Sequence, residues 1–324
     1  MVEKLKQIVL LAGVCSLLYA CEREEDPIQP YDRGGVETVQ IAMGENYGTQ
    51  VWYDLGTQQV VSTNERSAWD IAFDCSATSN NIFLNTSVAM KAAPVPGAVF
   101  EDVTSDAGLF YRPDHPEGHS DSLSFANWET TPAVWVLDLG FRASGTSRGK
   151  RKVSVEMTAD GAYSIRHAKL DGTEEGTAII QKDDRFNWLA FSFTTNSSIE
   201  IEPIKETYDL CFTTYTTVFY DPYLPYLVNG VLLNPHNTQA VRDTMDDFSA
   251  LNLDILADRD LTTQANIIGY NWKSYNLAEG AFTVFPQIVY LVQDSEGFYY
   301  KMHFIDFYDA NGIKGHPLFE MQRL

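Results

Sequence analysis

A strand pattern that occurs twice is the feature that most restricts how this chain can fold. The segments SAWDIAFDC (67–75) and ETYDLCFTT (206–214) each place an aromatic residue, an aspartate, an aliphatic residue, a small residue and a phenylalanine in succession. In the first copy Trp69, Ile71 and Phe73 fall on one face, which is the period-two alternation of a half-buried strand. The pattern predicts a chain that is rich in strands.

The strands that precede the two copies also match in order. An aromatic strand, a turn and an aliphatic strand come before each copy, at 52–61 and at 191–201. This matching order indicates either a duplicated β-unit or two successive domains of similar build. Residues 37–324 are therefore expected to form one β domain, with two possible β-units at about 37–185 and 186–324.

The aspartate of each copy, Asp70 and Asp209, is expected to be structural. It points to the opposite face from the core or to the edge of the strand, where a carboxylate accepts hydrogen bonds from a turn. A catalytic role is the alternative.

The remaining chain predicts an all-β fold of mostly antiparallel sheets and hairpins. Asp-Gly turns at 160–161 and 171–172 are strong hairpin signals, and strands at 287–293 and 298–309 form a clear hairpin near the C-terminus. One short helix is expected over 238–249, because apolar residues recur there at i, i+4 and i+7.

The N-terminus is expected to be a lipoprotein signal peptide. Lys4 and Lys6 precede a short apolar run, and residues 1–20 end at the lipobox-like Leu-Tyr-Ala before Cys21. Cleavage before Cys21 would leave a lipidated cysteine on an acidic, Pro- and Gly-containing tether over 21–36. Ordinary signal cleavage is the alternative. The protein is thus expected to reach a membrane through a lipid anchor on Cys21.

Charge and motifs exclude several classes of function. The formal net charge of −21 repels nucleic acid, so DNA or RNA binding is not expected. The sequence contains no nucleophile elbow, zincin helix, P-loop or dinucleotide fingerprint. The chain is expected not to be an enzyme.

Two cysteines, Cys75 and Cys211, remain beyond the N-terminal segment and occupy nearly equivalent positions in the repeated strands. In an oxidising compartment they could form a disulfide if the strands were adjacent. Two separately buried thiols are the favoured alternative.

The loop DHPEGHSD (114–121) concentrates histidines and acids. Imidazole and carboxylate are metal ligands, so His115, His119 and Asp121 form a candidate metal site. A solvated loop is the favoured alternative, because the proline and glycine prevent a helical presentation of the histidines.

Three segments carry a resemblance to a known family: the lipobox with its acidic tether, residues 52–87, and the segment 268–321 with its DFYDANGIKG turn. Together they resemble the HmuY family of haem-binding outer-membrane lipoproteins. The resemblance implies an all-β, non-catalytic, cell-surface lipoprotein of the outer membrane. It further implies iron acquisition, in which the protein captures haem for a TonB-dependent receptor.

Family members hold the haem iron through two side chains, and this chain offers few equivalents. The expected candidates are His236, with Met245 or Tyr275. The aromatic-rich stretch near 214–228 is either a ligand platform or a core strand followed by a proline turn. A non-catalytic binding or adhesion module on the same fold, without haem, is the alternative function.

Overall fold

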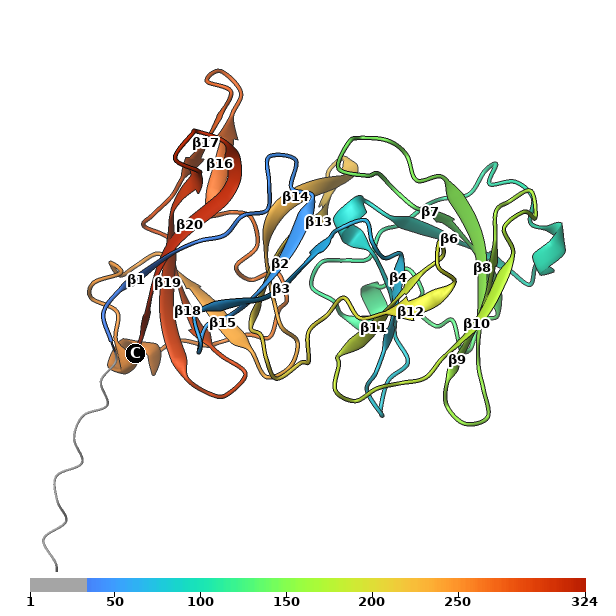
Figure 1. Ribbon diagram of the computed structural model, residues 1–324, viewed down its shortest axis with the longest axis horizontal. Helices are drawn as coiled ribbons and strands as arrows, with labels where there is room; N and C mark the ends of the chain where they lie inside the picture. Colours follow the sequence, from blue (N-terminus) through green and yellow to red (C-terminus); the bar gives the residue numbers. More distant parts are fainter. Residues whose placement is uncertain (1–33) are drawn as a thin grey trace, which may run out of the picture. The chain divides into compact units, whose positions relative to one another are not determined.

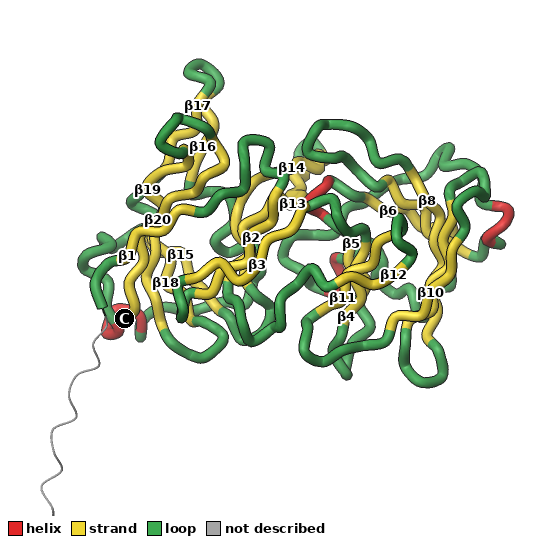
Figure 2. Tube along the Cα trace, viewed as in Figure 1, coloured by secondary structure: helices red, strands yellow, loops and turns green. Residues whose placement is uncertain are grey.

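The computed structural model describes residues 34–324, which contain two β-sandwiches (Figure 1). The signal peptide expected at 1–20 and the lipidation at Cys21 lie outside the described residues, as does most of the expected tether. Strands dominate and helical segments are few and short (Figure 2). All paired strands are antiparallel, so the all-β fold expected from the sequence is confirmed.

The first sandwich packs a five-stranded sheet against a four-stranded one. The five-stranded sheet has the order β1 (Glu37–Gln40), β20 (Lys314–Arg323), β19 (Tyr299–Tyr308), β18 (Val289–Gln293) and β15 (Gln239–Asp243). The four-stranded sheet has the order β14 (Tyr223–Leu233), β13 (Leu210–Tyr220), β2 (Thr49–Asp54) and β3 (Gln59–Glu65). Their facing side chains form one buried core that includes Tyr53, Phe212 and Phe319.

The second sandwich has the same build. Its five-stranded sheet has the order β10 (Gly176–Ile180), β9 (Tyr163–Ala168), β8 (Lys150–Met157), β7 (Ala133–Asp138) and β6 (Lys91–Pro96). Its four-stranded sheet has the order β12 (Ser197–Ile199), β11 (Trp188–Ser192), β4 (Ile71–Asp74) and β5 (Ile82–Leu84). Phe73, Tyr163 and Phe191 lie in the core between these sheets.

A separate hairpin and four short helical segments complete the described chain. The hairpin pairs β16 (Lys273–Asn276) with β17 (Ala281–Val284) and joins no other sheet (Figure 1). The helical segments are η1 (Thr86–Val88), η2 (Phe100–Asp102), η3 (Ser120–Ser122) and α2 (Leu253–Leu256). No helix within residues 34–324 has the length and hydropathy of a membrane span.

Each four-stranded sheet combines strands from both halves of the sequence. In the first sandwich, β2 pairs with β13, and in the second, β4 pairs with β11. The two repeated strands, which contain residues 71–74 and 210–214, therefore occupy equivalent central positions in two different sheets. The division into β-units at about 37–185 and 186–324 stays a prediction.

The two repeated aspartates make equivalent hydrogen bonds. Asp70 accepts from the backbone N–H of Phe193, at 2.7 Å, just after β11 ends. Asp209 accepts from the N–H of Leu55, at 2.9 Å, just after β2 ends, and from the N–H of Ser295. Each carboxylate thus satisfies the turn that follows its partner strand, as the sequence predicted.

The helix predicted over 238–249 is wrong in position. Residues Gln239–Asp243 form β15, which pairs with β18, and the short helix α2 lies further on at Leu253–Leu256. Asp243 explains why no helix continues there, because its Oδ1 accepts from the N–H groups of Met245 and Asp246 and closes a turn. The pairing of β15 with β18 therefore outweighed the weak helical periodicity of the apolar residues over 238–249.

The thiols of Cys75 and Cys211 are both free and buried. Burial raises the pKa of each thiol, so both stay protonated and unreactive at neutral pH.

Candidate functional site

An aromatic-walled cavity of about 390 Å³ lies between the two sandwiches. It forms where the outer faces of the two four-stranded sheets meet, since side chains from β2 and β11 contact each other there. Four large rings contribute to its wall: Trp52 in β2, Trp69 just before β4, Trp188 in β11 and Tyr208 just before β13.

The four rings pack on one another and are rigid. Trp69 stacks on Trp188 with ring centroids 5.2 Å apart and planes 26° apart. Trp52 meets Tyr208 edge to face at 5.0 Å and lies 6.0 Å from Trp188. Such aromatic pairs contribute roughly 0.5–1.5 kcal/mol each beyond area burial. The wall is therefore preformed.

Protein partners satisfy the indole N–H groups of Trp52 and Trp69. Trp52 Nε1–H donates to Asn64 Oδ1 and Trp69 Nε1–H donates to Gln50 Oε1, each at 2.9 Å. Trp52, Trp69 and Tyr208 are at most 6% exposed, so the aromatic surface open to a ligand is mainly that of the partly exposed Trp188.

The buried carboxyl group of Glu202 accepts hydrogen bonds from two residues of this wall, Trp188 and Tyr208. Its Oε1 accepts from the Tyr208 hydroxyl at 2.6 Å, and its Oε2 accepts from the N–H groups of Asn187 and Trp188 at 2.8 and 3.0 Å. Burial raises the pKa of Glu202 to about 7, against these hydrogen bonds. The positions of Trp188 and Tyr208 are thus linked to one titratable group.

The histidine-rich loop forms part of the cavity lining. Asp114 is buried and fixes the loop, because its two oxygens accept from the N–H groups of Leu84 and Ser124 at 2.7 Å each. Burial raises the pKa of Asp114 to about 6. The loop is therefore tied both to β5 and to its own C-terminal end.

Two imidazoles on this loop, His115 and His119, line the cavity. Both approach the same oxygen of Glu117: His115 Nδ1 lies 3.6 Å and His119 Nε2 lies 3.8 Å from Glu117 Oε2. The side chain of His119 is 68% exposed and that of His115 is 25% exposed. One nitrogen of each imidazole remains free of hydrogen bonds within the described chain, so both can serve as ligands.

The metal site predicted at His115, His119 and Asp121 stays a prediction. Asp121 belongs to η3, and the acid that both imidazoles approach is Glu117 instead. Residues 34–324 contain no group of three or more His, Cys, Asp or Glu side chains arranged to hold a metal ion.

His236, the first haem candidate, lies in the turn between β14 and β15, one residue beyond the cavity-lining Pro235. Its side chain is 27% exposed, and its Nε2 lies 4.0 Å from Glu206 Oε1. His236 thus borders the cavity without belonging to its lining.

The other two haem candidates lie elsewhere. Met245 follows β15 and is 76% exposed, while Tyr275 is in β16, where its half-exposed ring packs at 5.0 Å from Phe282. Within residues 34–324, no hydrogen bond, ion pair or ring contact joins any two of His236, Met245 and Tyr275. The three stay predictions.

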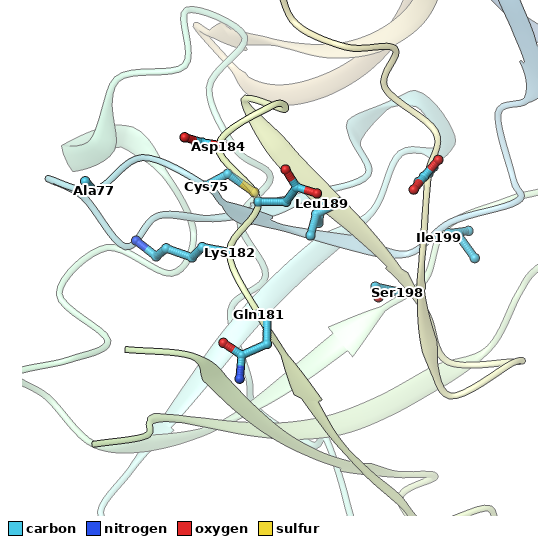
Figure 3. Close-up of a pocket in the computed structure, with 10 residues that line it drawn as sticks. Cys75, Ala77, Gln181, Lys182, Asp184, Leu189, Ser198 and Ile199 are labelled. Carbon is cyan, nitrogen blue, oxygen red and sulfur yellow. The ribbon is translucent and has the colours of Figure 1, made fainter. Parts of the chain in front are cut away.

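A second pocket, of about 650 Å³, lies beside Cys75 and differs in character (Figure 3). Its lining includes Lys182, Asp183, Asp184 and Glu200 but no aromatic ring. The Lys182 ammonium is already bound by two backbone carbonyls and one amide oxygen. Its apolar lining consists of small and aliphatic side chains such as Ala77, Leu189 and Ile199, so this pocket offers a ligand no aromatic ring.

Sequence reasoning missed the aromatic wall. We expected Trp69 to share the core face with Ile71 and Phe73, but Trp69 packs with Ala72 and Ala190 between the sandwiches. The reason is that β4 begins only at Ile71, so the alternation does not extend to Trp69. The signal available in the sequence was the aromatic residue directly before the aspartate in both repeated strands.

Comparison with known families gives one match. The family model described as HmuY protein matches residues 46–321, which is most of the chain. No curated protein matches the sequence.

Several solved structures align with the chain at low identity. Apo PinO from Porphyromonas gingivitis aligns with a TM-score of 0.35 and 10% identity, covering 90% of this chain and 99% of that one. The apo HmuY analog of Tannerella forsythia gives 0.26 and 9%, covering 90% and 98%. An HmuY-like heme binding protein from Bacteroides vulgatus gives 0.23 and 12%, covering 88% and 90%.

Proposed function

The chain belongs to the HmuY family, and on that premise we propose that it is a surface lipoprotein that binds haem in the cavity between its sandwiches. The observation that carries the proposal is the combination of a preformed aromatic wall with the two imidazoles of His115 and His119. Proteins hold haem iron through side chains such as imidazole and surround the porphyrin with apolar groups.

The residues of the cavity fit a flat apolar ring with a charged edge. The partly exposed Trp188 supplies aromatic surface, with the buried rings of Trp52 and Trp69 packed beside it. Further apolar lining includes Phe83, Leu123, Leu232, Leu233 and Ala265. No lysine or arginine is among the described residues of the lining, so the carboxylates of a bound porphyrin would stay at the open, water-facing side.

Within this proposal, the protein's own groups have distinct tasks. His115 and His119 each offer an imidazole nitrogen, and Glu117 places one carboxylate oxygen within 3.8 Å of both rings. Glu202 fixes Trp188 and Tyr208 and keeps the wall in place before any ligand arrives.

An absorption titration with haemin tests the proposal. The wild-type protein is expected to shift the Soret band with one-to-one stoichiometry, and the double variant His115→Ala/His119→Ala is expected to weaken binding at least tenfold. His316→Ala, a histidine in β20 of the first sandwich, is the matched control and should bind like wild type. Absence of a Soret shift in the wild type would refute haem binding.

The same titration separates the two histidine assignments. If His236→Ala alone abolishes the shift while the double variant retains it, the ligand is His236, and His115 and His119 are not ligands. Met245→Ala and Tyr275→Phe examine the remaining candidates in the same way.

We also propose that the protein is anchored in the outer membrane through Cys21 and passes haem to a TonB-dependent receptor. The support is the lipobox-like sequence before Cys21 together with family membership. Labelling with a palmitate analogue in a Gram-negative host should mark the wild type and not Cys21→Ser. Transfer is measured as loss of the Soret shift when haem-loaded protein meets the purified receptor.

One observation favours the alternative, a binding module that recognises a protein partner. The tip of the β13–β14 hairpin exposes an unusual number of large apolar side chains, namely Phe219, Tyr220, Tyr223, Leu224 and Tyr226. This corresponds to the end of the stretch near 214–228, whose earlier part is buried strand. Exposed aromatic clusters of this kind are typical of interaction surfaces.

A further inference from the structure

A small basic cavity of about 250 Å³ lies at one end of the second sandwich. Five cationic side chains line it against two acidic ones: Arg142, Arg148, Lys150, Arg151 and Lys169 against Asp70 and Glu174. The lining thus has an excess of three positive charges, or two when Asp106, the partner of Lys150, is included. The chain as a whole has a net charge of −21, so the charge of this lining is opposite in sign to that of the protein.

Four of these five cations come from one stretch of the sequence. The segment RASGTSRGKRK (142–152), which covers the end of the connection from β7 and the first residues of β8, supplies Arg142, Arg148, Lys150 and Arg151, and Lys169 directly follows β9. Backbone contacts hold the connection in place, because Phe141 N–H donates to the Val88 carbonyl at 2.8 Å. Gly140 is required there, since its φ is +69° and a Cβ would lie 1.9 Å from the Val88 oxygen.

Two arginines form a fixed floor. The side chains of Arg148 and Arg151 are only 8% and 9% exposed. Arg148 bonds Asp70 at 2.7 Å and three backbone carbonyls, and Arg151 bonds the side chain and the carbonyl of Glu174. Their guanidinium groups are therefore held in place before any ligand binds.

Other groups of the lining have hydrogen-bond donors or positive charge that the protein itself does not fully pair. Arg142 is exposed, and its guanidinium makes no hydrogen bond or ion pair within the described chain. The hydroxyl of Thr194, on the same lining, likewise has no partner among the described residues. Lys169 shares the single carboxylate of Glu174 with Arg151. These groups leave positive charge and free donors on the lining of this cavity.

We infer that this cavity binds a doubly charged oxyanion of the phosphate or sulfate type. Guanidinium groups match the geometry of such oxyanions, and Arg142 supplies the charge that no carboxylate of the protein neutralises. The cavity is separate from the aromatic one, because the two linings share no residue. The oxyanion comes either from solution or from the phosphate monoester of a lipid headgroup, since both present the same group.

Calorimetry with inorganic phosphate, at constant ionic strength maintained with chloride, tests the site in the folded protein. Wild type is expected to bind phosphate, and Arg142→Gln is expected to bind about tenfold more weakly. The control is Arg185→Gln, which removes the same charge from another exposed arginine, one paired with Asp183. Circular dichroism spectra and melting temperatures establish that both variants fold.

Vesicles distinguish the two sources. A lipid source is supported if the protein binds phosphatidic acid vesicles but not phosphatidylcholine vesicles, and if Arg142→Gln loses this binding while Arg185→Gln keeps it. A free ion is supported if the protein binds soluble phosphate but neither kind of vesicle. The inference is overturned if neither probe binds wild type, or if the two variants weaken binding equally.

Discussion

Replacing Glu202 with glutamine should remove a pH-dependent cost to stability that the wild type carries. Glu202 is 2% exposed, and four hydrogen bonds from Asn187, Trp188 and Tyr208 reach its carboxyl group. Glutamine cannot ionise, and it keeps one carbonyl oxygen for the backbone amides. Its NH₂ can donate to the Tyr208 oxygen but cannot accept from Asn187 Nδ2, and this loss does not change with pH. The substitution therefore tests the charge of the side chain more than its packing.

The magnitude follows from the shift in pKa. In the unfolded chain the carboxyl ionises near its ordinary value of 4.5, and in the folded protein burial raises its pKa to about 7. Between these values the folded state holds a proton that the unfolded state has lost, so the contribution of Glu202 to stability is highest below pH 4.5 and is lost as pH rises through 7. A shift of this size corresponds to ~3 kcal/mol of unfolding free energy.

Urea unfolding followed by tryptophan fluorescence, repeated between pH 4.5 and 8, measures the effect. The free energy of unfolding of Glu202→Gln minus that of wild type should rise by ~3 kcal/mol across this range. Taking the difference cancels the contributions of Asp114 and Asp209, whose pKa values burial also raises. Glu200→Gln, at an exposed neighbouring position, reports the effect of losing one negative charge. A difference for Glu202→Gln that does not change with pH would show that the folded protein does not raise the pKa of Glu202.

Three further substitutions have expected outcomes. Asp209→Ala leaves two backbone N–H groups without their acceptor and should lower the free energy of unfolding by roughly 2–6 kcal/mol, measured by chemical denaturation. An unchanged denaturation midpoint would contradict the structural role of the repeated aspartate. Lys273→Met should raise the melting temperature at pH 7, because burial lowers the pKa of Lys273 well below its usual value and no acid pairs with it among the described residues. The gain should shrink as pH rises toward 10.5, where the unfolded chain also loses the proton. A melting temperature that falls at pH 7 would contradict this prediction. Gly140→Ala should prevent accumulation of soluble protein or lower the melting temperature by several degrees, because the new Cβ would overlap the Val88 carbonyl. A variant as stable as wild type would show that the connection between β7 and β8 is not tightly held against Val88.

The sequence predicted the fold class and several local details because the relevant signals are local. The Asp-Gly turns at 160–161 and 171–172 do join β8 to β9 and β9 to β10. The C-terminal hairpin, expected at 287–293 and 298–309, is formed by β18 and β19. Alternation and turn chemistry act over a few residues, so a single sequence is enough to detect them.

Features that depend on distant pairing could not be predicted. The pairing of β2 with β13 and of β4 with β11 joins strands far apart in the chain, and no local pattern specifies the register. The same limitation explains the error at 238–249, where β18 supplies the partner that makes β15 a strand. It also explains why the aromatic wall was missed, because the wall exists only once two sheets from different sandwiches face each other.

A crystal structure of the haemin complex would locate the ligand. We expect porphyrin density in the cavity between the sandwiches, in contact with Trp188 and within bonding distance of an imidazole of His115 or His119. Haemin bound elsewhere, for example at the β16–β17 hairpin near Tyr275, or held by no side chain of the cavity, would contradict it.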